Sequence, residues 1–205
     1  MTARKKRLIC ICLAAALLAA AGYCYLKAPW GFAREVSRQE KAMRLLYVET
    51  AAGYLGDNES DGSHRAIIDL YNSHQPLAQD YTVTYEDSWC AAFVSAMAIQ
   101  SGITDIVPTE CSCERQIGLF RDLGRWQEKD TYVPLPGDLI FYDWDEWGLG
   151  DSTGWADHVG IVVGTKWPFI KVIEGNWKDS VTYHYILMGH PQVRGFALPD
   201  FASIC

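Results

Sequence analysis

Cys90 stands at the start of the apolar segment "WCAAFVSAMAIQSG", which is the setting of a reactive thiol. Asp87 or Ser88 can cap a helix that begins around Trp89, and Cys90 would then lie in its first turn. Unpaired backbone N–H groups and the helix dipole favour an anion there, so we expect the thiol to ionise readily, more so beside a protonated imidazole. The competing interpretation is a buried core cysteine, because free cysteines are often buried in apolar helices.

A histidine and two candidate partners follow on a predicted β-hairpin. "DHVGIVVG" and "FIKVIEGN" alternate like two strands joined by "TKWP". Placing Gly164 opposite Phe169 sets the register. His158 then falls opposite Glu174 or Asn176, which are two residues apart and so share one face of the strand. The pairing predicts a base and a group that orients it; the alternative is a histidine satisfied by chance at a sheet end.

Glu174 is the expected primary orienter of His158. It lies within the apolar part of the strand, whereas Asn176 lies where the strand is ending. A carboxylate beside the imidazole would stabilise its charged form, and an amide would fix the ring without much effect on charge.

The elements that must position these residues change in character along the chain. Helical spacing and capping signals predict helices over residues 35–55, about 67–71, 89–102 and 114–123. Short runs rich in Val, Ile, Tyr and Phe predict strands over 138–144, 158–164, 169–174, 181–187 and 193–198. Helices followed by strands indicate an α+β fold, with N-terminal helices packed on an antiparallel β-sheet.

Charge separates the N-terminal segment from the rest of the 205-residue chain. The net charge is −7, but five of the 18 basic residues lie within residues 1–27, which contain no acid. Residues 28–205 therefore carry 13 basic against 25 acidic groups. A domain this acidic argues against nucleic acid as a partner.

The first residues read as a membrane segment. A basic tail over 1–7 precedes an uncharged run over 8–26, which is just long enough to span a bilayer. We expect a transmembrane signal-anchor, or a signal peptide cleaved near Ala19–Ala21, then a linker over 27–34 and a catalytic domain over 35–205. The basic flank predicts a cytoplasmic tail and a single-pass protein with its domain on the outer face of the cell membrane.

The cysteines other than Cys90 do not suggest a metal site. Three lie in the apolar N-terminal run, and Cys111 and Cys113 form "ECSCE". Zinc ligands are normally spaced by two to four residues and need a second pair, so we expect no metal here. The number of cysteines is too small for a disulfide-built scaffold, and pairing of Cys111 or Cys113 with Cys205 stays open.

Four motifs carry a resemblance to a known family. "WCAAFVSAM", "PGDLIFYDW", "DHVGIVVG" and "VIEGN", in this order, resemble the CHAP family of cysteine, histidine-dependent amidohydrolases/peptidases, including its membrane-anchored Gram-positive type. The resemblance covers most of residues 36–198. It implies a papain-like (NlpC-like) fold, with Cys90 as nucleophile, His158 as base, and Glu174 and Asn176 as the Glu-x-Asn pair of the family.

The resemblance also implies a substrate and a reaction. A peptidoglycan hydrolase would cleave the muramoyl-L-alanine amide or a bond of the stem peptide or cross-bridge through a thioester, with no cofactor. The alternatives are a cysteine peptidase or acyltransferase acting on protein, and a non-catalytic wall-binding module of the same fold. The complete residue set argues against the last. We expect a monomer whose partners are peptidoglycan or muropeptides.

Overall fold

The computed structural model describes part of the chain, namely residues 30–129, 131–145 and 154–205, with Ala14, Ala15, Leu17, Leu18, Gly22 and Tyr25. The chain divides into two compact units, Met1–Trp30 and Gly31–Cys205. Of the predicted anchor over 8–26, the structure describes Ala14, Ala15, Leu17, Leu18, Gly22 and Tyr25, and the other residues lie outside the described part of the chain. Among the residues that are described, no helix has the length and apolar character needed to cross a membrane. The boundaries predicted for the tail, anchor, linker and catalytic domain stay predictions.

The unit Gly31–Cys205 confirms the α+β prediction. Its described residues form four α-helices: α2 (Arg38–Ala52), α3 (Arg65–Asn72), α4 (Cys90–Ser101) and α5 (Cys113–Asp122). The strands are β1 (Trp126–Gln127), β2 (Leu139–Tyr142), β3 (His158–Lys166), β4 (Phe169–Trp177), β5 (Ser180–Leu187) and β6 (Val193–Ala197). Neighbouring strands are antiparallel, in the order β1-β6-β2-β3-β4-β5. Only β1 was not predicted, because two residues are too few to show a period.

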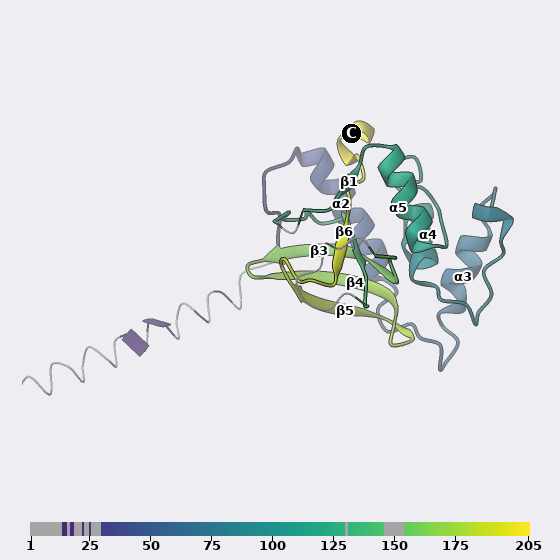
Figure 1. Cartoon of the computed structure of the whole chain (residues 1–205), viewed down its shortest axis with the longest axis horizontal. Coiled ribbons are helices and arrows are strands. Elements are labelled where there is room, and N and C mark those ends of the chain that lie inside the picture. Colours follow the sequence, from purple (N-terminus) through teal and green to yellow (C-terminus); the bar gives the residue numbers. More distant parts are fainter. Residues whose placement is uncertain are drawn as a thin grey trace, which may run out of the picture. The chain divides into compact units, whose positions relative to one another are not determined.

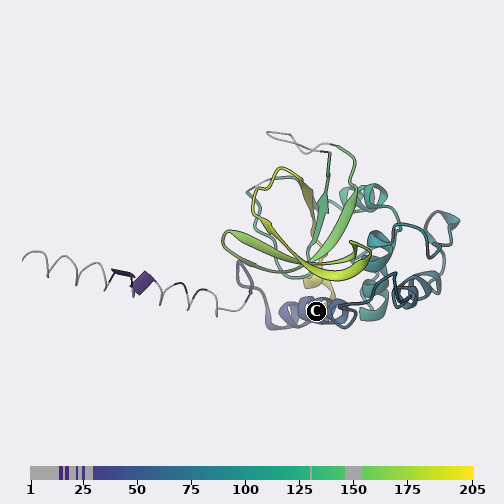
Figure 2. The ribbon, with the colours of Figure 1, turned by 90° about the horizontal axis from the view of Figure 1, so that it is seen from below.

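Helix α4 is the centre of the fold. It contacts α2 and α3 as well as β3 and β4, and its residues from Cys90 to Ala98 are all buried. A helix that is apolar all round is typical of one with neighbours on every side. Figures 1 and 2 show the curved sheet with helices beside it, and α4 contacts both α3 and α5. Gly102 ends α4 in the left-handed conformation, as predicted.

The predicted side-chain cap of α4 is wrong. Trp89 occupies the cap position and makes no side-chain hydrogen bond to the helix start. The Asp87 carboxylate instead accepts hydrogen bonds from the Thr84 backbone N–H (2.7 Å) and the Tyr81 hydroxyl (2.8 Å). Short acidic side chains bond readily within their own turn, and here that local turn prevails over the helix cap.

The β3–β4 hairpin has a tighter turn than predicted. Lys166, rather than Gly164, pairs with Phe169. A register shift further along β3 recovers one residue, so that Ile161 pairs with Ile173. The two departures oppose each other. At the end of the hairpin that carries His158, the register is therefore within one residue of the estimate.

A buried ion pair fixes the start of β2, the strand whose Tyr142 pairs with His158. Arg44 Nη1 donates to Asp138 Oδ1 at 2.8 Å. The second oxygen, Oδ2, accepts from the Tyr132 hydroxyl (2.7 Å) and the Leu135 backbone N–H (2.9 Å). Both carboxylate oxygens therefore have partners, which a buried charge requires. The "PGD" part of the second motif is thus structural: it ties the sheet to α2.

Candidate active site

Cys90 is the first residue of α4, and only 5 % of its surface is exposed. The backbone N–H groups of a first helical turn have no partners within the helix, which leaves the Cys90 N–H for an incoming anion. A hydrogen bond from the Cys113 thiol lowers the pKa of Cys90. Burial opposes this, but the interaction with His158 lowers the pKa further, to well below its ordinary value. The interactions with Cys113 and His158 therefore favour the thiolate form of Cys90.

His158 is the first residue of β3, and its ring lies between Cys90 and Glu174. Its Nε2 is 3.5 Å from Glu174 Oε2, which is an ion-pair distance, and both atoms are buried. The His158 ring also makes a hydrogen bond with the Cys90 side chain. Burial acts to lower the pKa of His158, but the hydrogen bonds with Cys90 and Glu174 raise it to about 10. The geometry favours a thiolate–imidazolium pair.

Glu174 is fully buried and holds two imidazoles. Its Oε2 faces His158, and its Oε1 accepts a hydrogen bond from His184 Nδ1 at 3.2 Å. Burial acts to raise the pKa of Glu174, but the two histidines lower it below its ordinary value. Sequence reasoning brought Glu174 to His158 and missed His184. Strand pairing could have indicated His184. Thr182 pairs with Glu174, and His184, two residues further along β5, pairs with Val172, so its side chain lies on the same face as that of Glu174.

Gly160 explains how Glu174 reaches a histidine that is not directly opposite. Continuing the register beyond Ile161 and Ile173 places Gly160 opposite Glu174. A Cβ on Gly160 would lie 2.6 Å from Glu174 Cγ and 2.5 Å from Val172 Cγ1. The Glu174 side chain therefore passes through the space that a side chain at 160 would fill, and it meets His158 diagonally.

Replacing Gly160 by alanine should push Glu174 away from His158. Losing a close carboxylate destabilises the imidazolium, so the midpoint of the His158 titration should move to lower pH by about one pH unit or more. NMR titration of the imidazole signals measures this. Gly118→Ala is the matched control, because a Cβ there meets open space. An unchanged titration of His158 in folded Gly160→Ala would contradict the diagonal contact.

Asn176 contacts the start of α4 rather than His158. Its amide oxygen accepts from the Trp89 backbone N–H (3.1 Å), and its amide nitrogen donates to Glu59 Oε1 (3.3 Å). Glu59 Oε1 also accepts from Trp89 Nε1 at 3.0 Å. The expected common face with Glu174 fails because strict alternation needs extended backbone, and Asn176 has a φ of 60°. Asn176 is placed to hold the residue before Cys90, and its catalytic role stays a prediction.

Aromatic rings form one wall beside the histidines. The Trp177 ring stacks on His184 with a centroid distance of 4.4 Å, and it lies 5.7 Å from His158. Trp144 lies 5.8 Å from His158. The two tryptophans and His184 line part of a pocket of about 350 Å³. Between β2 and β3, residues 146–153 lie outside the described part of the chain.

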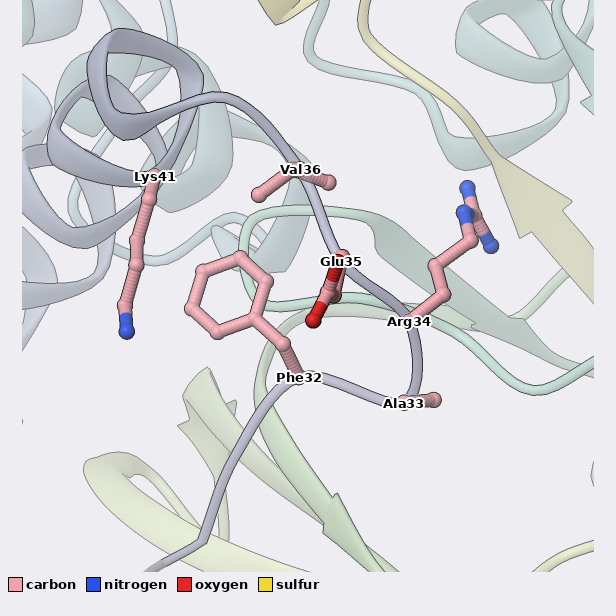
Figure 3. Close-up of a pocket in the computed structure, with 6 residues that line it drawn as sticks. All are labelled: Phe32, Ala33, Arg34, Glu35, Val36 and Lys41. Atoms are coloured by element: carbon pink, nitrogen blue, oxygen red, sulfur yellow. The ribbon is translucent and has the colours of Figure 1, made fainter.

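A second pocket lies away from these residues. It measures about 480 Å³, and Figure 3 shows its lining of Phe32, Ala33, Arg34, Glu35, Val36 and Lys41. All six come from the segment that leads into α2 and from its first turns. Lys41 Nζ lies 5.4 Å from the centroid of the Phe32 ring. The lining of this pocket includes none of Cys90, His158, Glu174 and Asn176.

Comparison with known proteins bears on the same stretch of chain. No curated protein and no solved structure matches it. The region that matches a family contains Cys90, His158, Glu174 and Asn176, together with Cys113, whose sulfur is 3.6 Å from that of Cys90. The membrane-anchored Gram-positive type stays a prediction. At the level of the family the resemblance is confirmed over these residues: positions 80–176 match the CHAP domain.

Proposed function

We propose that this protein is a cysteine-dependent hydrolase of peptidoglycan. It would cleave the muramoyl-L-alanine amide, or a peptide bond of the stem or cross-bridge. One observation carries the proposal: the His158 ring interacts both with a thiol at a helix start and with a buried carboxylate 3.5 Å from its Nε2. The match of residues 80–176 to the CHAP domain supports the substrate class.

Attack by the thiolate begins the reaction. The Cys90 sulfur adds to the amide carbonyl carbon, and the carbonyl oxygen becomes an oxyanion. The Cys90 backbone N–H, which points out of the first turn of α4, would stabilise that oxyanion. A donor of this kind typically contributes about 3 kcal/mol to transition-state stabilisation.

His158 would move the protons of both half-reactions. Its imidazolium gives a proton to the departing amine, the C–N bond breaks, and a thioester to Cys90 remains. The neutral ring then accepts a proton from water, which attacks the thioester and releases the acid and the thiolate. Glu174 keeps the ring oriented and stabilises the charged form at the beginning and end of the cycle.

Digestion of purified bacterial cell walls tests this function. The full chain is incubated with the walls, and the soluble products are identified by mass spectrometry, with Cys90→Ala as the inactive control. Stem peptides with a free N-terminal alanine would indicate the amidase, and cut peptides still attached to glycan would indicate the endopeptidase. Cleavage of unfolded protein but not of walls would favour a protein peptidase. Binding to walls with no product from folded protein would favour a binding module.

We also propose that residues 8–26 anchor the protein, as a monomer, with the domain on the outer face of the cell membrane. The support is the uncharged run that follows four consecutive basic residues, Arg4–Arg7. On fractionation of cells that express the full chain, the protein should stay with membranes after an alkaline wash and keep its N-terminus. A soluble species that begins near Gly22 would show that the segment is a cleaved signal, and light scattering reports the oligomeric state.

A further inference from the structure

Cys113 lies beside the candidate nucleophile, and no step of the proposed hydrolysis uses it. Its Sγ is 3.6 Å from Cys90 Sγ, and both side chains are buried. Each cysteine is the first residue of a helix, α4 or α5, so both sulfurs lie where a helix dipole favours an anion. Cys111, two residues earlier, contacts Gln79 Nε2 instead (3.6 Å). The "ECSCE" stretch therefore supplies one cysteine to the site and leaves the other outside it.

We propose that Cys113 is a resolving cysteine: when a peroxide oxidises Cys90, Cys113 forms a reversible disulfide with it. Cys90 and Cys113 together would be a redox modification site whose oxidant is hydrogen peroxide or a related small hydroperoxide. The proposal rests on the sulfur pair and on thiol chemistry, and it holds whichever bond the protein hydrolyses.

The chemistry balances in two steps. The Cys90 thiolate attacks one oxygen of hydrogen peroxide, the O–O bond breaks, and Cys90 becomes a sulfenic acid while the other oxygen leaves as hydroxide and takes up a proton. The Cys113 sulfur, once deprotonated, then attacks the Cys90 sulfur, and the S–O bond breaks as a second hydroxide leaves and is protonated. Two thiols and one peroxide give one disulfide and two waters. A dithiol reductant reverses the product by exchange.

The order of the two steps follows from the charges at the pair. While Cys90 is a thiolate, the hydrogen bond to it and its negative charge, together with burial, raise the pKa of Cys113 well above its ordinary value, so Cys113 stays a thiol. A sulfenic acid is neutral. Oxidation of Cys90 therefore removes its charge and the hydrogen bond to its thiolate, which is the largest cause of the raised pKa of Cys113. Burial and Asp157 still raise that pKa, and the dipole at the start of α5 opposes them in favour of the thiolate.

The sulfurs are close enough for this reaction. A disulfide bond is about 2.05 Å long, so from 3.6 Å the two atoms must approach by about 1.5 Å. All four cysteines of the unit Gly31–Cys205 are free in the described structure. Cys205 Sγ donates to the Phe201 carbonyl, and Cys111 lies against Gln79, so neither is aimed at Cys90.

Peptide mapping of peroxide-treated full-length protein tests the proposal. Fully reduced protein receives about one equivalent of hydrogen peroxide, the remaining thiols are alkylated, and the protein is digested without reductant. Wild type should yield a cross-linked Cys90–Cys113 peptide about 2 Da lighter than its two reduced halves, and alkylation of both cysteines should fall about tenfold. This readout needs no hydrolytic activity, so its failure is distinct from failure of the proposed function.

Two variants make the result specific. Cys111→Ala is the matched control and should form the same cross-link as wild type. Cys113→Ala should form none, and with more peroxide its Cys90 should gain about 32 Da as the sulfinic acid. If wall hydrolysis is established, dithiothreitol should restore it after peroxide in wild type and in Cys111→Ala, but not in Cys113→Ala. A wild-type cross-link from Cys90 to Cys111 or Cys205, or sulfinic acid in wild type as fast as in Cys113→Ala, would overturn the proposal.

Discussion

Replacing Cys90 by alanine is expected to lower kcat/KM for wall hydrolysis by about 10⁴-fold or more, because Cys90 is the thiol that interacts with His158, whereas Cys113 interacts with Cys90. The measurement is the initial rate of muropeptide release from purified walls. Cys111→Ala, which removes a thiol outside the site, is the matched control and should keep the wild-type rate. Retention of most activity by folded Cys90→Ala would show that Cys90 is a structural cysteine.

A double variant makes this prediction sharper. We expect Cys90 and His158 to act together as nucleophile and base, so Cys90→Ala and His158→Ala should each remove nearly all of the rate that the pair provides. The double variant should then be about as slow as either single one. Independent, additive losses would mean that His158 does not act through Cys90, and the mechanism would need another base.

Glu174→Gln is expected to lower kcat/KM by about 100-fold or more, since it removes the charge that orients and stabilises the imidazolium. The pH profile of kcat/KM should also change, and the pKa of His158 gives the direction of that change. Hydrogen bonds with Cys90 and Glu174 raise the pKa of His158 to about 10, against the effect of burial. Without the carboxylate that pKa falls. The alkaline limb of kcat/KM, which reports loss of the His158 proton, should therefore move to lower pH.

Asn176→Ala distinguishes the role of Asn176 from that of Glu174. Its amide holds Trp89 and Glu59, so its loss should disturb the start of α4 and slow the reaction without moving the alkaline limb. The opposite pattern, an unchanged profile in Glu174→Gln and no turnover in folded Asn176→Ala, would transfer the orienting role to the amide.

The larger elements could be predicted from the sequence because their periods are long enough to read. An apolar run predicts the helix at Cys90, and alternating apolar and polar residues predict the β3–β4 hairpin. The hairpin brings His158 and Glu174 together. The register error was small because a tighter turn and a register shift act in opposite directions. That outcome depended on a local irregularity that no periodic pattern contains.

The rest of the site depends on contacts between distant elements. Cys113 contacts Cys90 because the N-terminal ends of α4 and α5 lie next to each other in the fold. The spacing within "ECSCE" shows only that these cysteines lack the pattern of zinc ligands. Asn176 left the predicted face because its φ is 60°, which alternation cannot foresee. The predicted side-chain cap of α4 is absent because Asp87 forms a hydrogen bond within its own turn, which the residue types alone do not reveal.

Because α4 lies at the centre of the fold, opening of the candidate site is linked to unfolding of the whole domain. Cys90 and His158 belong to elements that pack directly on each other, and Cys90 is the first residue of α4, around which the hydrophobic core is built. Separating the two requires α4 to move off the sheet, which exposes much of the buried apolar surface. The cost of opening the site therefore approaches that of unfolding the domain. Amide hydrogens of α4 should then exchange only through global unfolding, and denaturant should abolish catalysis and compact structure in one transition.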